Sequence, residues 1–154
     1  MAQPANVRLD AQRAMDEAEI RQRIDNLVAA IRVMDLDSVM SIYAADIVSF
    51  DIEPPLQHVG AVAKRKNWLH AFSMYQRPLG YEIRDLTITV GDDVAFGHGL
   101  IRVSGTMTNG NRTESWLRCT TCFRKINGMW LIAHDQVSAP LDLGSGRALL
   151  NLAP

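Results

Sequence analysis

The sequence predicts one α+β domain, in which three N-terminal helices pack on a strongly bent antiparallel sheet. Three observations support this class. Segments with helical periodicity come first, four runs with strand character follow, and turn signals separate those runs. With 154 residues, of which 47% are hydrophobic, the chain is long enough for one core and too short for two domains. Residues 1–154 are therefore treated as a single domain.

Apolar residues that recur at steps of three and four indicate the first helix. They are Ile20, Ile24, Leu27, Ile31 and Met34. Such a stripe is typical of an amphipathic helix packed on a core. Residues 1 to about 10 are expected to form a flexible N-terminus.

A second, short helix is predicted at DLDS, where Asp35 or Asp37 can cap its N-terminus. This helix is expected to bury Tyr43 and to end at AAD. The β-rich run IVSFDIE follows and stops at a Pro-Pro pair. Its β-rich composition and its position predict a short strand between two helices.

The third helix is predicted from Gly60 onward, over AVAKRKNWLHAFSMY. Its aromatic residues Trp68, Phe72 and Tyr75 fall on one stripe, where they are expected to anchor the core. The KRK sequence at 64–66 is interpreted as a solvated face of this helix.

Four strand-like runs complete the chain: YEIRDLTITV, DVAFGHGLIRVSGTM, RTESWLRCTTCFRKI and MWLIAHDQVSAP. The last two are joined by Asn127-Gly128, a type I′ turn signal that fixes the register if no bulge intervenes. That register pairs Thr121 with His134. It points His134 toward the helices and Asp135 away from them. Residues 141–154 form a C-terminal tail that is expected to lie over the pocket or an interface.

Composition argues against several classes of partner. Lys and Arg together number 16 and Asp and Glu 17, for a net charge of −1, so no global field attracts nucleic acid or an anionic membrane. The N-terminus has neither a signal-peptide core nor an apolar span of roughly 20 residues. A cytoplasmic protein is therefore expected.

No metal or other cofactor is expected either. The only cysteines are Cys119 and Cys122. Residues three apart on a strand point to opposite faces, and no second ligand pair completes a metal site. Phosphate-binding loops, GxSxG and HExxH sequences are also absent, so nucleotide binding, serine hydrolysis and zinc proteolysis have no support.

Three residues carry candidate chemistry. Asp51 follows strand-like alternation with Ser49, so it either points inward or caps the backbone at the strand end. His134 is either a core histidine bonded to Thr121 or to the backbone, or a general acid or base tuned in a dry pocket. His98 lies between two glycines, which leave room for a ligand or for close packing.

The order of elements, the sequence DLDSVMSIYAADIVSFDIEPPLQHVGAVA and the terminal GMWLIAHDQVSAP together resemble the nuclear transport factor 2-like superfamily. The resemblance is closest to its SnoaL-like and ketosteroid-isomerase-like branch and covers about 20–140. It implies a cone-shaped domain, in which a bent sheet wraps around the long helix and leaves a deep pocket. It also implies a homodimer through the outer sheet face, where Trp116, Arg118 and Arg124 are expected.

The resemblance carries over only part of a catalytic site. In ketosteroid isomerases the general-base aspartate follows a YAxD helix end, ahead of a Pro-containing loop and a Gly, and Asp51 occupies that position. Those enzymes stabilise the enolate with a tyrosine of the first helix and a protonated aspartic acid of the third long strand. Leu27 and the segment 119–121 hold the matching positions, so that oxyanion hole is absent.

Other members suggest other partners for Asp51. Scytalone dehydratase has Asp and His partners, which is compatible with His98 and His134. Limonene epoxide hydrolase has an Asp-Arg-Asp set, which would need Arg118 and Asp135 in the pocket. The predicted register of the last hairpin argues against that set.

The resulting hypothesis is a cofactor-free isomerase, dehydratase or cyclase that acts on an apolar, carbonyl-bearing small molecule. Asp51 would remove a proton next to the carbonyl while His134 donates a hydrogen bond to the developing enolate. The expected substrate contacts are Tyr43, Phe50, His58, Trp68, Phe72, His98, Cys119, Thr121 and Trp130. The alternative is a non-catalytic ligand-binding or dimeric accessory domain of the same fold.

Overall fold

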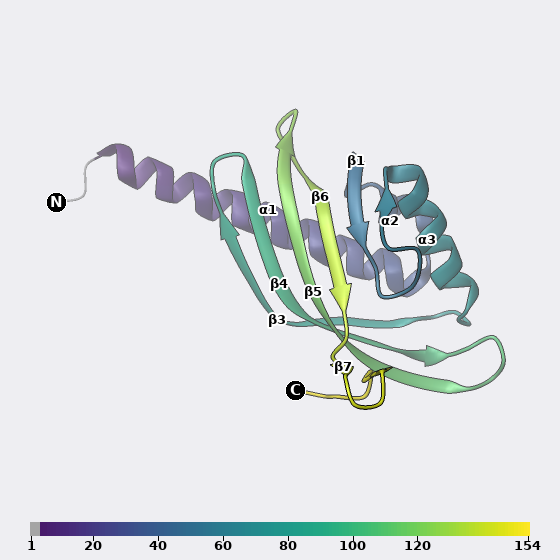
Figure 1. Ribbon diagram of the computed structural model, residues 1–154. Helices are drawn as coiled ribbons and strands as arrows, with labels where there is room; N and C mark the ends of the chain where they lie inside the picture. The colour runs from purple at the N-terminus through teal and green to yellow at the C-terminus, as the bar shows by residue number, and fades with distance from the viewer. Residues whose placement is uncertain (1–3) are drawn as a thin grey trace.

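Three helices and eight strands form the fold, which the computed structural model describes for residues 4–154 (Figure 1). The helices are α1 (Pro4–Val33), α2 (Leu36–Met40) and α3 (Ala61–Ser73). The strands are β1 (Tyr43–Phe50), β2 (His58–Val59), β3 (Gly80–Val90), β4 (Val94–Thr106), β5 (Arg112–Ile126), β6 (Met129–Ser138), β7 (Leu141–Asp142) and β8 (Arg147–Ala148). This order confirms the predicted α+β class.

Helix α1 buries the predicted stripe against the sheet. Ile20 and Ile31 are fully buried, and Ile24 and Met34 nearly so. The helix begins at Pro4, so residues 4–10, which were expected to be flexible, are helical, whereas 1–3 lie outside the described part of the chain. Figure 1 shows these first turns extending beyond the sheet, which explains why they carry no apolar stripe.

Between α1 and α3 the chain follows the prediction with one difference. Asp35 caps α2, because its carboxylate accepts a hydrogen bond from the Ser38 backbone N–H. Strand β1 then begins at Tyr43, within the segment predicted to end the second helix. The cause is tertiary pairing, since Tyr43 lies opposite Ile132 of β6.

The six-stranded sheet has the order β2-β1-β6-β5-β4-β3. Strand β1 runs parallel to β6, whereas the other neighbours are antiparallel. The sheet is therefore mixed, although its four long strands form the predicted antiparallel meander. It curves around α1, and α3 packs beside β1 (Figure 1), which gives the cone shape expected from the resemblance.

The last hairpin departs from its predicted register at one point. The Asn127-Gly128 turn pairs Ile126 with Met129, and Phe123 lies opposite Ile132 as predicted. Beyond that pair the register shifts, because Ala133 is an extra residue on β6.

The shift corrects the facing of the two residues that follow. His134 lies opposite Cys122, and Asp135 lies opposite Thr121. The predicted pairing of Thr121 with His134 is therefore wrong. Because a β-bulge reverses the alternation of side chains along its strand, Asp135 points toward the helices and His134 points away.

The core lies between α1 and the inner face of the sheet, and a buried polar contact closes it at one end. Trp130 is fully buried, and its indole N–H donates to the Asp16 carboxylate at 3.1 Å. Lys125 also donates to Asp16, at 2.8 Å. Burial, outweighed by these hydrogen bonds, leaves the pKa of Asp16 below its ordinary value. Within residues 4–154, no helix is long and apolar enough to cross a membrane.

The C-terminal tail folds back on the sheet. Strands β7 and β8 form a small hairpin, and the Leu150 carbonyl accepts a hydrogen bond from the Trp116 backbone N–H at 2.7 Å. Leu150 also lines the internal cavity. The tail thus lies over the pocket, one of its two expected positions.

Candidate functional site

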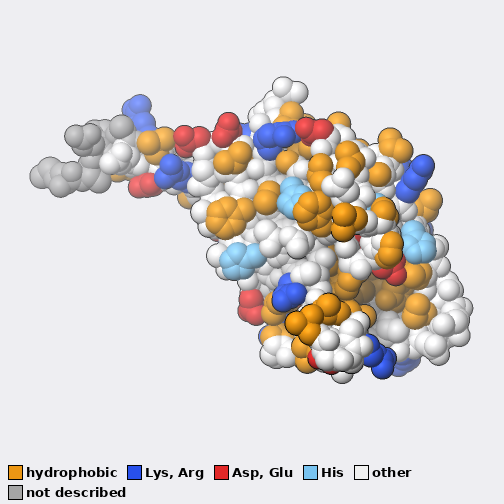
Figure 2. Space-filling model, in the orientation of Figure 1, with side chains coloured by type: hydrophobic (Ala, Val, Ile, Leu, Met, Phe, Trp, Pro, Cys, Tyr) orange, Lys and Arg blue, Asp and Glu red, His pale blue; other side chains and the backbone are white. Residues whose placement is uncertain are grey.

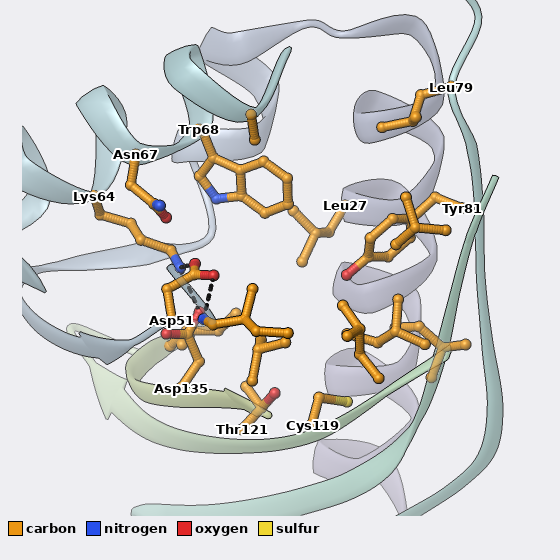
Figure 3. A pocket seen from close by; sticks show the side chains of 18 of the residues that line it. Leu27, Asp51, Lys64, Asn67, Trp68, Leu79, Tyr81, Cys119, Thr121 and Asp135 are labelled. Carbon is orange, nitrogen blue, oxygen red and sulfur yellow. Dashed lines mark hydrogen bonds and ion pairs between the residues drawn. The ribbon is translucent and has the colours of Figure 1, made fainter. Parts of the chain in front are cut away.

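A cavity of about 280 Å³ lies between α1, α3 and the inner face of the sheet. Its walls are mostly apolar, and its polar groups come from separate elements that meet at one end. Figure 3 shows Asp51, Lys64 and Asp135 together at that end, Tyr81 and Leu79 on the opposite wall, and Thr121 and Cys119 on the floor. This combination of apolar walls and a few convergent polar groups is typical of a small-molecule site.

Lys64 is the centre of the polar cluster. It is on the buried stripe of α3, one turn before Trp68, and its side chain is only 2% exposed. Its ammonium donates to the Ser49 hydroxyl at 2.8 Å and lies 3.0 Å from the Asp135 carboxylate and 3.7 Å from that of Asp51. It also lies 5.4 Å from the centre of the Tyr43 ring. A buried ammonium requires partners of this kind to offset its loss of hydration.

The two carboxylates of the cluster differ in their environments. Asp51 follows directly after β1, its side chain is 19% exposed, and its Oδ1 accepts a hydrogen bond from the Ile52 N–H at 2.8 Å. Asp135 comes from β6 and is more deeply buried, and its Oδ1 has no hydrogen-bond partner among the described residues. Asp51 is thus oriented by the backbone yet accessible, whereas Asp135 is held by Lys64 alone.

Two tyrosine hydroxyls complete the polar part of the cavity. Tyr43 accepts a hydrogen bond from the Trp68 indole N–H at 3.1 Å, which leaves its own O–H free to donate. Tyr81 of β3 points its hydroxyl into the cavity from the opposite wall (Figure 3). Burial, together with the nearby carboxylates, raises the pKa of both tyrosines well above the ordinary value. Both therefore stay protonated as hydrogen-bond donors.

The sulfur of Cys119 does not add a nucleophile. Its thiol donates to the Gly99 carbonyl at 3.4 Å, and burial raises its pKa to about 11, so the thiolate is scarce at neutral pH. Cys119 and Cys122 are both free cysteines. Over residues 4–154, no group of three or more His, Cys, Asp or Glu side chains is arranged to hold a metal ion.

The structure brings five of the eleven predicted site residues to the cavity. They are Tyr43, Asp51, Trp68, Cys119 and Thr121. The other six lie elsewhere: Phe50, His58, Phe72, His98, Trp130 and His134. The Asp51–His134 pair is therefore not formed.

His134 is on the outer side of the sheet because of the bulge at Ala133. Its Nδ1 is 2.7 Å from the Val48 carbonyl, and its ring packs edge-on against Phe50 at 4.7 Å. Phe50 is 39% exposed. Both residues belong to the outer face and neither can contact a substrate in the cavity.

The remaining corrections follow from strand alternation and core packing. His98 lies opposite Thr120 on the outer face, while its neighbour Gly97 lines the cavity. His58 is buried in β2, and Phe72 and Trp130 pack in the hydrophobic core. His98 is therefore excluded from the pocket by the face it lies on, whereas Phe72 and Trp130 are excluded because they pack in the core.

Sequence reasoning missed Lys64, Asp135 and Tyr81. Lys64 could have been found, because it falls on the same helical stripe as Ala61 and Trp68. The orientation of Asp135 depends on a bulge, and no turn residue in the sequence indicates that bulge. Tyr81 opens the third strand and was not singled out, although the alternation of that strand could place it on either face.

Comparison with known proteins supports the fold and the family. The profile of the SnoaL-like domain family matches residues 20–142, whereas no curated protein matches the sequence significantly. A nuclear transport factor 2-like protein of unknown function from Pseudomonas putida is 32% identical, with a TM-score of 0.84 over 92% of this chain and 98% of that one.

Two more distant structures share the fold alone. A ketosteroid isomerase-like protein from Erwinia carotovora atroseptica has 23% identity and a TM-score of 0.68, over 79% of this chain and 93% of that chain. A nuclear transport factor 2-like superfamily protein from Salmonella enterica has 17% identity and a TM-score of 0.75, over 88% of this chain and 99% of that chain. The family match and the Pseudomonas putida structure confirm the resemblance read from the sequence, and these two structures confirm its fold.

Proposed function

This chain belongs to the SnoaL-like domain family, and we propose that its cavity is the active site of a cofactor-free isomerase or lyase. The reaction is removal of a proton from the carbon next to the carbonyl of an apolar small molecule. The observation that carries the proposal is the accessible carboxylate of Asp51, held by the Ile52 N–H at the polar end of an otherwise apolar cavity. The ketosteroid isomerase-like structure with the same fold supports this reaction class.

The proposed chemistry divides between the two ends of the cavity. Asp51 takes the proton, the C–H electron pair forms a carbon–carbon double bond, and the carbonyl oxygen becomes an enolate. From the opposite wall, the hydroxyl of Tyr81 donates a hydrogen bond to that oxygen, replacing the His134 assigned from the sequence. The enolate then takes a proton at another carbon, as in an isomerase, or expels a leaving group, as in a lyase.

Lys64 supports the base without acting on the substrate. Its ammonium lies between Asp51 and Asp135, where its positive charge offsets part of the repulsion between two carboxylates in an apolar surrounding. The cluster keeps one formal negative charge in excess of its ammonium. An unneutralised carboxylate is the state that a general base requires before it accepts a proton.

Deuterium exchange tests this function without knowledge of the natural substrate. β-Tetralone is a small bicyclic ketone with activated protons next to its carbonyl, and in D₂O their exchange can be followed by NMR. The protein is expected to accelerate exchange. Asp46→Asn, a change on β1 at an exposed ion pair with Arg124, should not alter the rate. If no cyclic ketone that binds the cavity exchanges faster with the protein than without it, the domain is a ligand-binding module instead.

Tyr81→Phe is expected to slow this exchange by roughly ten- to a hundredfold, because it removes one donor to the enolate oxygen. Removal of a donor used only in the transition state should lower kcat more than it changes KM. The comparison variant is Tyr75→Phe, which changes the third tyrosine of the lining, whose hydroxyl accepts a hydrogen bond from Thr113. Equal rates for wild type and Tyr81→Phe would remove Tyr81 from the mechanism.

We further propose that the outer sheet face joins two copies of the chain. Phe50, Val94 and Phe96 are 39–57% exposed there, and Figure 2 shows hydrophobic side chains and histidine rings gathered on the sheet face turned away from α1. Trp116, predicted for this interface, is instead largely buried, with Arg84 against its ring. An apolar patch of this kind on a sheet face is typical of an interface.

Phe96→Glu is expected to shift the particle mass from twice 17.1 kDa toward 17.1 kDa, because it places a charge in the apolar centre of the proposed interface. Light scattering coupled to size-exclusion chromatography measures the mass directly. The control, Val62→Glu, changes an exposed apolar residue on α3, outside the sheet. A wild-type protein that is monomeric at high concentration would contradict the interface.

A further inference from the structure

One oxygen of the polar cluster has no partner in the fold. Asp135 is 7% exposed and its Oδ2 is 3.0 Å from the Lys64 ammonium, whereas its Oδ1 has no hydrogen-bond partner among the described residues. Buried carboxylate oxygens in native proteins are nearly always hydrogen-bonded, because an unpaired one loses its hydration without compensation. Since Asp135 lines the cavity, a bound molecule is the partner best placed to supply the missing donor.

The charges around the cavity restrict that molecule further. Three carboxylates line it, from Asp51, Glu53 and Asp135, and Lys64 is the single cationic side chain of the lining. The ammonium of Lys64 is already shared among Ser49 and the two aspartates. Its single positive charge already faces the two aspartate carboxylates, so a bound carboxylate would add a further negative charge in a low-dielectric space.

We propose that the substrate is an uncharged, apolar molecule with a hydroxyl group that donates a hydrogen bond to Asp135. This inference rests on the proposed use of the cavity as a substrate site and names the class of substrate. The hydroxyl is held at the Asp135 end, while the carbonyl lies toward the Tyr81 hydroxyl on the opposite wall. Carboxylic acids of the same shape are rejected by charge.

Three unreactive probes with one ring system test the class. Naphthalenemethanol carries the donor, its methyl ether lacks the donor, and naphthoate carries the negative charge; none has a proton next to a carbonyl. Quenching of tryptophan fluorescence, to which Trp68 in the cavity wall contributes, reports their binding. The alcohol should bind at least about tenfold more tightly than the ether, because a donor to an ionised acceptor is the stronger kind of hydrogen bond. Naphthoate should bind more weakly than both.

The variant Asp135→Asn tests whether Asp135 is the acceptor for the alcohol. Its amide oxygen can still accept from Lys64, but its NH₂ group replaces the unpartnered oxygen by a donor. The preference for alcohol over ether should therefore fall by about tenfold, and naphthoate binding should strengthen. The control, Asp46→Asn, removes an exposed carboxylate outside the cavity and should keep the wild-type order.

The proposal is overturned if wild type binds the ether as tightly as the alcohol, if naphthoate binds best, or if no alcohol binding is detected. It is also overturned if folded Asp135→Asn, verified by circular dichroism, keeps the wild-type preference. If that variant does not fold, the order of the three affinities in the wild-type protein alone decides whether the proposal stands. Because the probes do not react, failure of ketone exchange with the alcohol preference intact would reject only the catalytic function, and the reverse result would reject only the substrate class.

Discussion

Asp51→Asn is expected to reduce deuterium exchange into β-tetralone by roughly a thousandfold. A general base contributes on the order of a hundredfold to ten thousandfold to a proton transfer, and an amide oxygen is far too weak a base to replace a carboxylate. Asn keeps the acceptor for the Ile52 N–H, so the loop after β1 should retain its geometry. The measurement is the exchange rate at saturating ketone, for which the loss should appear in kcat.

The matched control is again Asp46→Asn, which lies on β1, the strand that ends just before Asp51, and outside the cavity. A useful second comparison is the binding of naphthalenemethanol, which should change by no more than about threefold in Asp51→Asn because Asp135 supplies its acceptor. Full exchange activity in Asp51→Asn would contradict the assignment of the base. Loss of both exchange and alcohol binding would instead indicate a distorted cavity.

Lys64→Met is expected to lower the free energy of unfolding by about 3–5 kcal/mol, the effect of removing one partner from a buried ion pair. Methionine fits the volume, but Asp135 and Asp51 then lie close together without a counter-charge, and the fully buried Ser49 loses its donor. Urea denaturation followed by circular dichroism measures the difference, with an unchanged m-value as evidence that the two folded states are comparable.

Lys66→Met provides the control, because Lys66 lies two residues away on the exposed face of α3 and should change stability by less than about 0.5 kcal/mol. The double variant Lys64→Met with Asp135→Asn should be less destabilised than the sum of its parts, since it removes the repulsion together with the ammonium. Additive effects, or a loss no larger than that of Lys66→Met, would show that the cluster is not a coupled buried ion network.

The sequence was sufficient for the architecture because periodicity and turn chemistry act locally. The α1 stripe, the Asp35 cap and the Asn127-Gly128 turn each depend on neighbours in the chain, and each appears as predicted. The parallel pairing of β1 with β6 was not predicted, because it joins segments far apart in the chain and has no local signature.

The site was predictable only where a local pattern determines the direction of a side chain. Asp51 was found through strand alternation, and it lines the cavity. Lys64 was assigned to solvent because a lysine within KRK is usually hydrated, although its helical position placed it among apolar residues. His134 and Asp135 exchanged faces because of one extra residue, Ala133, whose effect depends on pairing with β5.

The bulge at Ala133 has a consequence for comparing relatives of this chain. It reverses which residues of β6 face the cavity from that point on. Ile132 and Asp135 face the same side although they are three positions apart. Counting in twos from the Asn127-Gly128 turn therefore assigns His134 to the cavity in place of Asp135. When a relative is aligned with this chain, β6 should be placed by the Thr121–Asp135 pair, because a fixed spacing from the turn would compare outer-face residues with cavity residues.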